Sequence, residues 1–269
     1  MLEQPKDLKI HFVGFGPMTL GLDSYIAIKS AANVYGVKPI FWGIGVNPDD
    51  IWFRRIQEIA QIEVVPYVVE QFVSRLGYLA QKADYIRYCA LVNHGGLYLD
   101  SDSICVRSIF ELSELQFGVT VGWETTWNLF NGVMYVDRPF DADMVKICAE
   151  CYSMIEKNDV PVYGSLGPIL ISNLDAACNV LATSRDFKLN ELPACYFSYY
   201  PSGQWRNWLQ ENNTLDECIY VVHWWGAHAR QTVQQLTPEY LRNSTSFFAQ
   251  AVRKSLKDDP YVFSKQELY

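Results

Sequence analysis

The segment that most constrains this chain spans residues 83–107, ADYIRYCALVNHGGLYLDSDSICVR. Apolar residues recur around its start at spacings of four, three and four, the pattern of an amphipathic helix: Leu79, Ala83, Ile86 and Ala90. Gly95 and Gly96 are expected to end this helix, because glycine adopts the left-handed conformation at a helix C-terminus without a Cβ penalty. The apolar residues 97–99 then predict a short buried strand, and Asp100-Ser101-Asp102 follows it.

Two aspartates at the end of this strand form the first candidate site. Side chains alternate along an extended chain, so Asp100 and Asp102 are expected to point the same way. At a strand's carboxyl end, such a pair is a hard-oxygen site for Mg²⁺ or Mn²⁺ carrying phosphates. Asp84 and Arg87, three residues apart on the preceding helix, are close enough to pair or to hold one ligand. The alternative for the aspartates is a solvated strand end.

Composition limits the class of protein. A length of 269 residues suits one α/β domain with helical additions, or at most two closely joined lobes. The hydrophobic content of 49% and the mean hydropathy of −0.04 are typical of a soluble globular protein. A net charge of −8 argues against a nucleic-acid partner. No apolar run is long enough to cross a bilayer, so no transmembrane segment is expected.

The seven cysteines are scattered, odd in number, and accompanied by no recognisable secretory signal peptide, which predicts a cytoplasmic location. Cys148 and Cys151 form one C-x-x-C in a predicted helix, with no second pair at zinc spacing. We expect them to pack in the helix and not to bind metal. The glycosylation sequons at Asn212 and Asn243 carry no weight without a secretory route.

The front of the chain alternates between strand and helix patterns. Residues 8–13 and 39–44 predict strands, and residues 20–33 predict the helix between them. This alternation favours a parallel, Rossmann-like sheet. Such sheets bind nucleotides beyond the carboxyl ends of their strands, so the loops at 12–17 and 43–47 are candidates for the base and ribose.

Further elements are expected along the rest of the chain. Helices are predicted at 51–60, from about 73, at 141–157, after Pro168, and at 236–257 as one polar helix. Extended segments are predicted at 64–69, 118–123, 132–136 and 220–222.

Residues 84–102, DYIRYCALVNHGGLYLDSD, resemble the sugar-donor motif of glycosyltransferase family 32, which includes yeast Och-type mannosyltransferases and bacterial capsule transferases. The clostridial glucosylating toxins carry a similar Asp-x-x-Arg…Gly-Gly-x-Tyr-x-Asp-x-Asp block. The resemblance implies an α/β fold of the GT-A type, a Rossmann-like nucleotide-binding sheet with helical additions. It places this domain at residues 1–235 and a C-terminal helical extension of it at 236–269.

The same resemblance implies an activity. It is that of a retaining hexosyltransferase, which moves a hexose from a nucleotide diphosphate sugar to an acceptor hydroxyl with Mn²⁺ or Mg²⁺ as cofactor. UDP is the favoured nucleotide, and the product belongs to glycan or polysaccharide synthesis. The acceptor is left open between a glycan, a lipid-linked glycan and a protein.

Individual roles follow from the resemblance. Asp102 is the expected metal ligand, and Asp100 assists it or reaches the ribose. Arg87, which suits phosphate oxygens, joins these two as a catalytic candidate, and Asp84 is expected at the donor-sugar hydroxyls. The remaining donor contacts expected at this strand are Tyr98 and Ser101, and a tyrosine packed in the core is an equal alternative for Tyr98.

A late histidine is expected to complete the metal site. Residues 220–230, YVVHWWGAHAR, resemble the family's closing His-x-Trp element, which places His223 beside the aspartates as a ligand. His228 is a candidate hydrogen-bond donor to the diphosphate. A core histidine is the alternative for both. The Ser-Trp that usually follows this element in the family is missing from this sequence.

Three other segments carry weaker resemblance. The Asn-rich residues 124–131 nominate Asn128 and Asn131 for the sugar hydroxyls, with turn residues as the alternative. Residues 192–201 resemble a Leu-Pro…Phe-Tyr-Pro strand of the family. In the opening strand, Gly14 stands where the family has a tryptophan, so base stacking is assigned to one of two other aromatic residues, Phe12 or Phe15, which core packing explains equally well.

Two other functions compete with the transferase. A haloacid-dehalogenase-type phosphatase also ends an apolar strand in Asp-x-Asp, with the first aspartate as nucleophile, but its later lysine and acidic pair are not evident in this chain. A non-catalytic relative that binds nucleotide sugar without turnover is the second alternative, and the Gly14 departure favours it.

Overall fold

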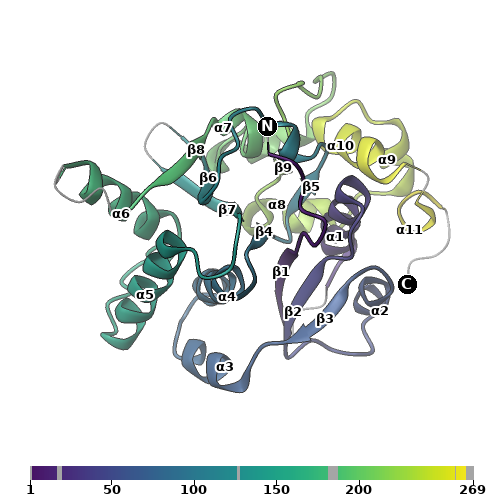
Figure 1. Cartoon of the computed structure of the whole chain (residues 1–269). Helices are drawn as coiled ribbons and strands as arrows, with labels where there is room; N and C mark the ends of the chain where they lie inside the picture. Colours follow the sequence, from purple (N-terminus) through teal and green to yellow (C-terminus); the bar gives the residue numbers. More distant parts are fainter. Residues whose placement is uncertain (1, 17–19, 126–127, 181–186, 258, 265–269) are drawn as a thin grey trace.

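The computed structural model describes residues 2–16, 20–125, 128–180, 187–257 and 259–264. A seven-stranded sheet in the order β3-β2-β1-β4-β7-β6-β8 runs through the molecule (Figure 1). Strands β1 to β4 are mutually parallel, β7 runs antiparallel to both of its neighbours, and β8 pairs parallel with β6. The expected α/β fold with a mainly parallel, Rossmann-like sheet is therefore confirmed. A separate two-stranded ladder joins β5 to β9.

Strands and helices alternate along the chain from β1 to β4, as a parallel sheet requires. The strands are β1 Ile10–Phe15, β2 Ile40–Ile44, β3 Gln61–Val64, β4 Gly96–Leu99, β5 Ser103–Cys105, β6 Val119–Trp123, β7 Leu129–Val136, β8 Leu189–Leu192 and β9 Val221–His223. The α-helices are α1 Leu22–Tyr35, α2 Ile51–Ile59, α3 Tyr67–Ser74, α4 Leu79–His94, α5 Ala142–Glu156, α6 Pro168–Val180, α7 Ala194–Phe197, α8 Gly226–Val233, α9 Pro238–Asn243, α10 Phe247–Leu256 and α11 Pro260–Phe263. Two 3₁₀ helices, η1 Ile109–Glu111 and η2 Ser202–Leu209, complete the described elements.

Helices cover both faces of the sheet, because successive strand residues point to opposite sides. In β4, Leu97 and Leu99 join a core with α1, α2 and α10, whereas Tyr98 between them joins a second core with α4, α5 and α6. Figure 1 shows the first group of helices to the right of the sheet and the second to its left. Helices α9 and α10 contribute to the same core as β1 and β4, so the chain's last helices are integral to the fold.

Three predicted elements are wrong in ways that local chemistry explains. Residues 67–69 are helical and not extended, because Pro66 is the N-cap of α3. The long helix α4 starts at Leu79, after a separate short helix, and not near Val73. The expected strand at 192–201 ends at Leu192, where Pro193 begins α7.

The predicted polar helix at 236–257 is also wrong. It is two helices, α9 and α10, divided at Ser244–Ser246, where Ser246 caps α10 by accepting a hydrogen bond from the backbone N–H of Ala249. Helix α10 is not a polar surface helix either, since seven of its side chains are buried.

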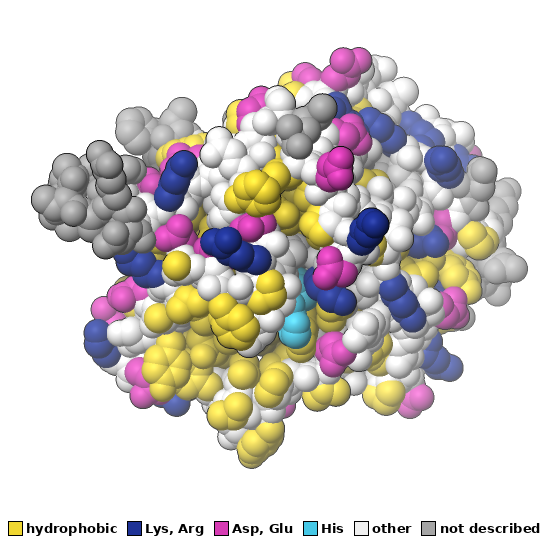
Figure 2. All heavy atoms as spheres, in the orientation of Figure 1, with side chains coloured by type: hydrophobic (Ala, Val, Ile, Leu, Met, Phe, Trp, Pro, Cys, Tyr) yellow, Lys and Arg dark blue, Asp and Glu magenta, His cyan; other side chains and the backbone are white. Residues whose placement is uncertain are grey.

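The surface in Figure 2 mixes acidic and basic side chains over most of the visible face and gathers apolar ones at the lower left. Three highly exposed large apolar side chains lie together where β3 leads into α3: Val64, Tyr67 and Val68. No helix of the described residues has the length and apolar character that a membrane crossing requires.

The junction between α4 and β4 generates a stability prediction. Gly96 has a φ of +91°, and a Cβ at this position would lie 2.3 Å from the carbonyl oxygen of Lys9 in β1. Gly96→Ala should therefore lower the free energy of unfolding by about 3 kcal/mol, through both backbone strain and overpacking. Gly36→Ala is the matched control, because Gly36 has a φ of +66° but open space around it. Its cost should be about 1 kcal/mol. Urea unfolding measures both, and equal losses would contradict the assigned close approach.

Candidate active site

The ladder between β5 and β9 brings a late segment of the chain onto the strand-end aspartates. The chain leaves β4, makes a turn in which the backbone N–H of Ser103 donates to the carbonyl of Asp100 (3.1 Å), and enters β5. Ser103 then pairs with His223 in the antiparallel ladder. The backbone N–H of Trp224 extends this pairing by donating to the carbonyl of Asp102 (3.1 Å). Sequence-distant residues thus meet at the carboxyl end of β4.

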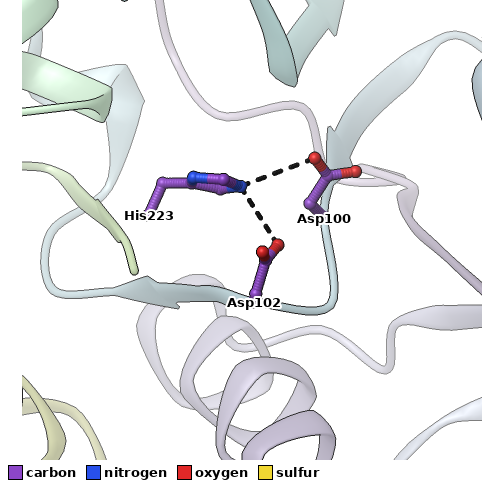
Figure 3. Close-up of side chains that lie close together, drawn as sticks. All are labelled: Asp100, Asp102 and His223. Atoms are coloured by element: carbon purple, nitrogen blue, oxygen red, sulfur yellow. Dashed lines mark ion pairs between the residues drawn. The ribbon is translucent and has the colours of Figure 1, made fainter. Parts of the chain in front are cut away.

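Three potential ligands converge at this point (Figure 3). Nε2 of His223 lies 3.0 Å from Oδ1 of Asp102 and 3.6 Å from Oδ2 of Asp100. The three ligand atoms lie within 4.8 Å of one another, and this is the only group of three or more potential ligands among the described residues. Cys151, by contrast, packs in the core, as expected for the C-x-x-C segment.

The electrostatics of this group reflect its burial. Burial alone would lower the pKa of His223, but the charges of Asp102 and Asp100 outweigh it and raise that pKa to about 9. Burial alone would likewise raise the pKa of Asp102. The His223 charge and hydrogen bond and the backbone N–H of Gly226 instead hold it well below its usual range. An imidazolium between two carboxylates therefore holds the place that a cation would take.

The group fits a divalent metal ion. Nδ1 of His223 is buried without a hydrogen-bond partner among the described residues. Nε2 lies between the two carboxylate oxygens, so a divalent ion placed there would replace the proton between the imidazole and these oxygens. Two carboxylates and one imidazole suit Mn²⁺ better than Mg²⁺, which prefers oxygen ligands alone.

Asp100 is held in place by the helix before it. Nη2 of Arg87 lies 2.9 Å from Oδ1 of Asp100, and the hydroxyl of Tyr98 donates to the same oxygen at 2.8 Å. The guanidinium also pairs with Asp84 (3.3 Å), donates to the carbonyl of Asn131, and lies over the Tyr98 ring. Arg87 is only 3% exposed, so its guanidinium has little contact with solvent and serves to orient Asp100.

A second polar group adjoins this one on the β7 side. The amide of Asn131 donates to Oδ1 of Asp84 at 2.8 Å, and Nδ2 lies 3.1 Å from the hydroxyl of Tyr88. Burial raises the pKa of Asp84 to about 6, an effect that the Arg87 charge and the Asn131 amide oppose. Gly167, just before α6, closes over the pair, since a Cβ there would lie 2.8 Å from the Asn131 amide nitrogen. Asp84 and Asn131 are thus fixed by each other.

Aromatic rings pack against the His223 side chain. The rings of Phe130 and Trp225 contact the His223 ring edge-on, with centroids 4.7 Å and 4.3 Å away. Trp225 has a φ of 58°, an uncommon backbone conformation for a residue other than glycine, and its indole N–H donates to the carbonyl of Tyr200 at 2.7 Å. A strained backbone conformation of this kind persists only where the contacts around it hold it in place.

A cavity of about 440 Å³ opens over these residues. The end of β1 and the start of α4 line one part of it, and Asp100, Ser101 and Asp102 line another. Tyr78 and Tyr163, which are 52% and 60% exposed, stand at its mouth with their rings edge to face at 5.8 Å.

The comparisons with known proteins agree with this geometry. Residues 45–118 match the family described as "Glycosyltransferase sugar-binding region containing DXD motif". These residues are similar to the DXD sugar-binding region of glycosyltransferases. The resemblance of residues 84–102 to that family is therefore confirmed, and Asp100-Ser101-Asp102 is the Asp-x-Asp of the matched segment.

A curated relative points the same way over part of the chain. The uncharacterized glycosyltransferase L373 of Acanthamoeba polyphaga mimivirus is 34% identical over 86 residues. This match spans 32% of the present chain and 30% of the viral protein.

Solved structures of glycosyltransferases share the fold of this DXD protein. The apo form of GlyE from Streptococcus pneumoniae TIGR4 is 16% identical, with a TM-score of 0.52 over 93% of this chain and 60% of that one. The galactosyltransferase LgtC, solved with donor and acceptor sugar analogs, is 14% identical, with a TM-score of 0.51 over 92% of this chain and 94% of that one. These similarities confirm the expected GT-A fold.

The residues predicted for this DXD site are not all found at the cavity. The candidates that line it are Phe15, Arg87, Tyr98, Asp100, Ser101 and Asp102, while Asp84 and Asn131 lie in the adjoining polar group. Phe12 is fully buried in the core, and His228 and Asn128 are exposed but are not among the lining residues. The neighbours Thr126 and Trp127 lie outside the described residues.

Packing explains why Gly14 replaces the family's tryptophan. A Cβ on Gly14 would lie 2.3 Å from the tip of the Phe41 ring in β2, so that ring fills the space which a side chain at position 14 would need. Phe15, one residue later, lines the cavity instead. The departure at Gly14 therefore has a local packing explanation.

Sequence reasoning missed four aromatic or charged lining residues: Asp23, Tyr78, Tyr163 and Arg230. The two tyrosines belong to no motif. Asp23 and Arg230 form an ion pair between α1 and α8, and no local sequence pattern indicates it.

The three-ligand geometry predicts metal binding that depends on one aspartate. Asp102→Asn should weaken Mn²⁺ binding at least about 100-fold, because a neutral amide replaces a buried anionic ligand. Asp143→Asn is the matched control. It alters the second Asp-x-Asp of the chain, at the start of α5, which belongs to no ligand group among the described residues. Calorimetric titration with Mn²⁺ measures both variants, and equal affinities in the two would contradict the assigned site.

Proposed function

We propose that this protein is a metal-dependent, retaining glycosyltransferase that moves a hexose from a nucleotide diphosphate sugar, with UDP favoured, to an acceptor hydroxyl. The observation that carries the proposal is the convergence of Asp100, Asp102 and His223 beside a cavity, with both aspartates inside the matched residues 45–118. The proposed cofactor is Mn²⁺, with Mg²⁺ as the alternative, held by these three side chains. When bound, such an ion stabilises as a Lewis acid the negative charge that develops on the departing diphosphate.

The chain's own residues prepare this site. Arg87 and Tyr98 fix one oxygen of Asp100, so that its second oxygen faces His223. The site is therefore arranged before any ligand arrives, which lowers the cost of organising the reaction. Arg87 acts in this proposal as a positioning residue for Asp100, and direct contact with phosphate is not part of its role.

The donor is proposed to lie in the cavity between the end of β1 and the end of β4. Phe15, at the carboxyl end of β1, is the proposed contact for the base, and Ser101 contributes a hydroxyl beside the metal ligands. Asp84 and Asn131 hold each other and Arg87 beside the cavity, so their proposed role is to support Arg87. They are left out as donor contacts, as are Phe12, Asn128 and His228, because none of these residues is among those that line the cavity.

Retention of the anomeric configuration is proposed to proceed by same-face displacement. Each carboxylate lining the cavity is already engaged: Asp23 by Arg230, Asp100 by Arg87 and Tyr98, and Asp102 by His223. Among the described lining residues, none is left as an uncommitted nucleophile for a covalent sugar intermediate. Positioning of donor and acceptor within the cavity then carries the rate.

The acceptor is proposed to be a glycan, a lipid-linked glycan or a protein, and the product to serve glycan or polysaccharide synthesis. A cytoplasmic setting is proposed on the six free cysteines of the described residues, which suit a reducing compartment.

Screening nucleotide sugars for Mn²⁺-dependent release of free nucleotide tests the function. One donor should give clear turnover, chelation of the metal should abolish it, and Asp102→Asn should reduce kcat/KM at least about 100-fold, since the metal supplies several kcal/mol of charge stabilisation. Asp143→Asn should keep full activity.

Two results would overturn this proposal. Metal-dependent phosphate release from a generic phosphate ester, without nucleotide-sugar turnover, would favour the phosphatase. Stoichiometric binding of a nucleotide sugar with no turnover, even with a panel of acceptors present, would favour a non-catalytic binding protein.

A further inference from the structure

Arg230 is a cation at the cavity that none of the predicted roles uses. It lies on α8, the helix that begins three residues after His223, and its side chain is 31% exposed. It lines the same cavity as Asp102, and the two side chains lie close together, because a Cβ on Gly226 would lie 3.0 Å from Oδ2 of Asp102 and 3.2 Å from Nη2 of Arg230. Figure 1 shows α8 behind the carboxyl end of β4, on the side of α1.

A buried carboxylate holds this arginine. Asp23, near the start of α1, is 1% exposed and accepts a hydrogen bond from Nε of Arg230 at 3.0 Å. Among the described residues, Nε is the only side-chain nitrogen of Arg230 with a hydrogen-bond partner. The two terminal nitrogens remain available to a ligand in the cavity.

The other arginine of the cavity cannot serve in the same way. Among the described lining residues, only Arg87 and Arg230 carry a positive charge. Arg87 is engaged by Asp84, Asp100 and the Asn131 carbonyl. Arg230 is therefore the one lining cation of the described part of the chain whose terminal nitrogens are uncommitted.

The surroundings of Arg230 fit an anion next to a metal ion. A planar guanidinium donates paired hydrogen bonds to phosphate oxygens. Gly226, one helical turn earlier, allows Asp102 and Arg230 to approach its backbone closely, because it has no Cβ.

We propose that Arg230, oriented by Asp23, binds the diphosphate of the donor and of the nucleotide product beside the metal ligands. Asp23 is a positioning residue. It accepts the hydrogen bond from Nε of Arg230, so that the two terminal nitrogens can donate to the phosphates. The proposal rests on the function proposed above and adds to it the residue pair that recognises the diphosphate.

Nucleotide binding tests this assignment. The affinities of UDP, GDP and uridine in the presence of Mn²⁺ are measured by calorimetry for the wild type, Arg230→Gln, Arg230→Lys and Asp23→Asn. Arg230→Gln should weaken binding of the preferred diphosphate about tenfold or more and leave uridine binding unchanged. Arg230→Lys keeps the charge and should retain part of the affinity. Asp23→Asn should give an intermediate loss, and the double variant should bind no more weakly than Arg230→Gln.

A control separates this role from a purely structural ion pair between α1 and α8. Arg138→Gln removes an arginine charge from an ion pair with Asp141, outside the cavity. It should change neither the diphosphate affinity nor the uridine affinity. A structural role would lower the melting temperature of Arg230→Gln without changing the ratio of diphosphate to uridine affinity. That outcome, or an unchanged diphosphate affinity, would refute the proposal while the transferase function stands. A wild-type protein that binds neither UDP nor GDP would overturn both.

Discussion

The pairing of β5 with β9 is the constraint on which the site depends. It is a ladder of three residue pairs, and its last pair, Ser103 with His223, sets an imidazole directly against the acidic end of β4. The ladder is anchored from the α1 side, where the hydroxyl of Ser30 accepts from the backbone N–H of Cys105 (3.0 Å) and Ser255 donates to the Cys105 carbonyl. Buried backbone groups are thereby satisfied on both sides of a short ladder, which fixes its register.

Charge balance favours a cation at this group. Asp84 and Asp100 both lie against the guanidinium of Arg87, and Asp102 pairs with His223. Protonation of His223 removes part of the excess negative charge. A divalent ion would remove all of it and release the proton from the imidazole, so metal binding and proton release would be coupled. The raised pKa of His223 has the same cause, the negative charge of the two neighbouring carboxylates.

Much of the site was predictable because its signals are local. The helix stop at Gly95 and Gly96, the strand after it and the two aspartates are encoded within one short segment, and the structure places them as expected. His223 could be placed only by its resemblance to a motif, since its contact with Asp102 depends on a ladder between distant strands.

The failures of prediction have physical causes of the same kind. Pro66, Pro193 and Ser246 each cap a new helix inside a segment whose apolar pattern had predicted one continuous element. The cap residue decides where the helix starts. The pairing of Asp23 with Arg230 had no signal at all, since an ion pair between two helices depends on how both of them pack.

The structure also divides the site into two sides with different freedom to change. On the β1 side, Asp23 and Arg230 tie the first helix to α8, so changes there disturb the fold and the candidate diphosphate site together. On the other side, Tyr163 lies in the connection between α5 and α6. That connection is fixed from beneath, where the buried Gln81 donates to the Val162 carbonyl at 2.9 Å and the Tyr88 hydroxyl donates to the Leu166 carbonyl at 2.8 Å.

The exposed rings at the mouth of the cavity can therefore vary while the backbone beneath them stays in place. Tyr78 and Tyr163 make contact with each other and present more than half of their surfaces to solvent. Because the metal ligands and their supports lie deeper, substitutions of these rings would reshape the entrance without moving Asp100, Asp102 or His223. The entrance of the cavity can thus change independently of the ligand group at the strand end.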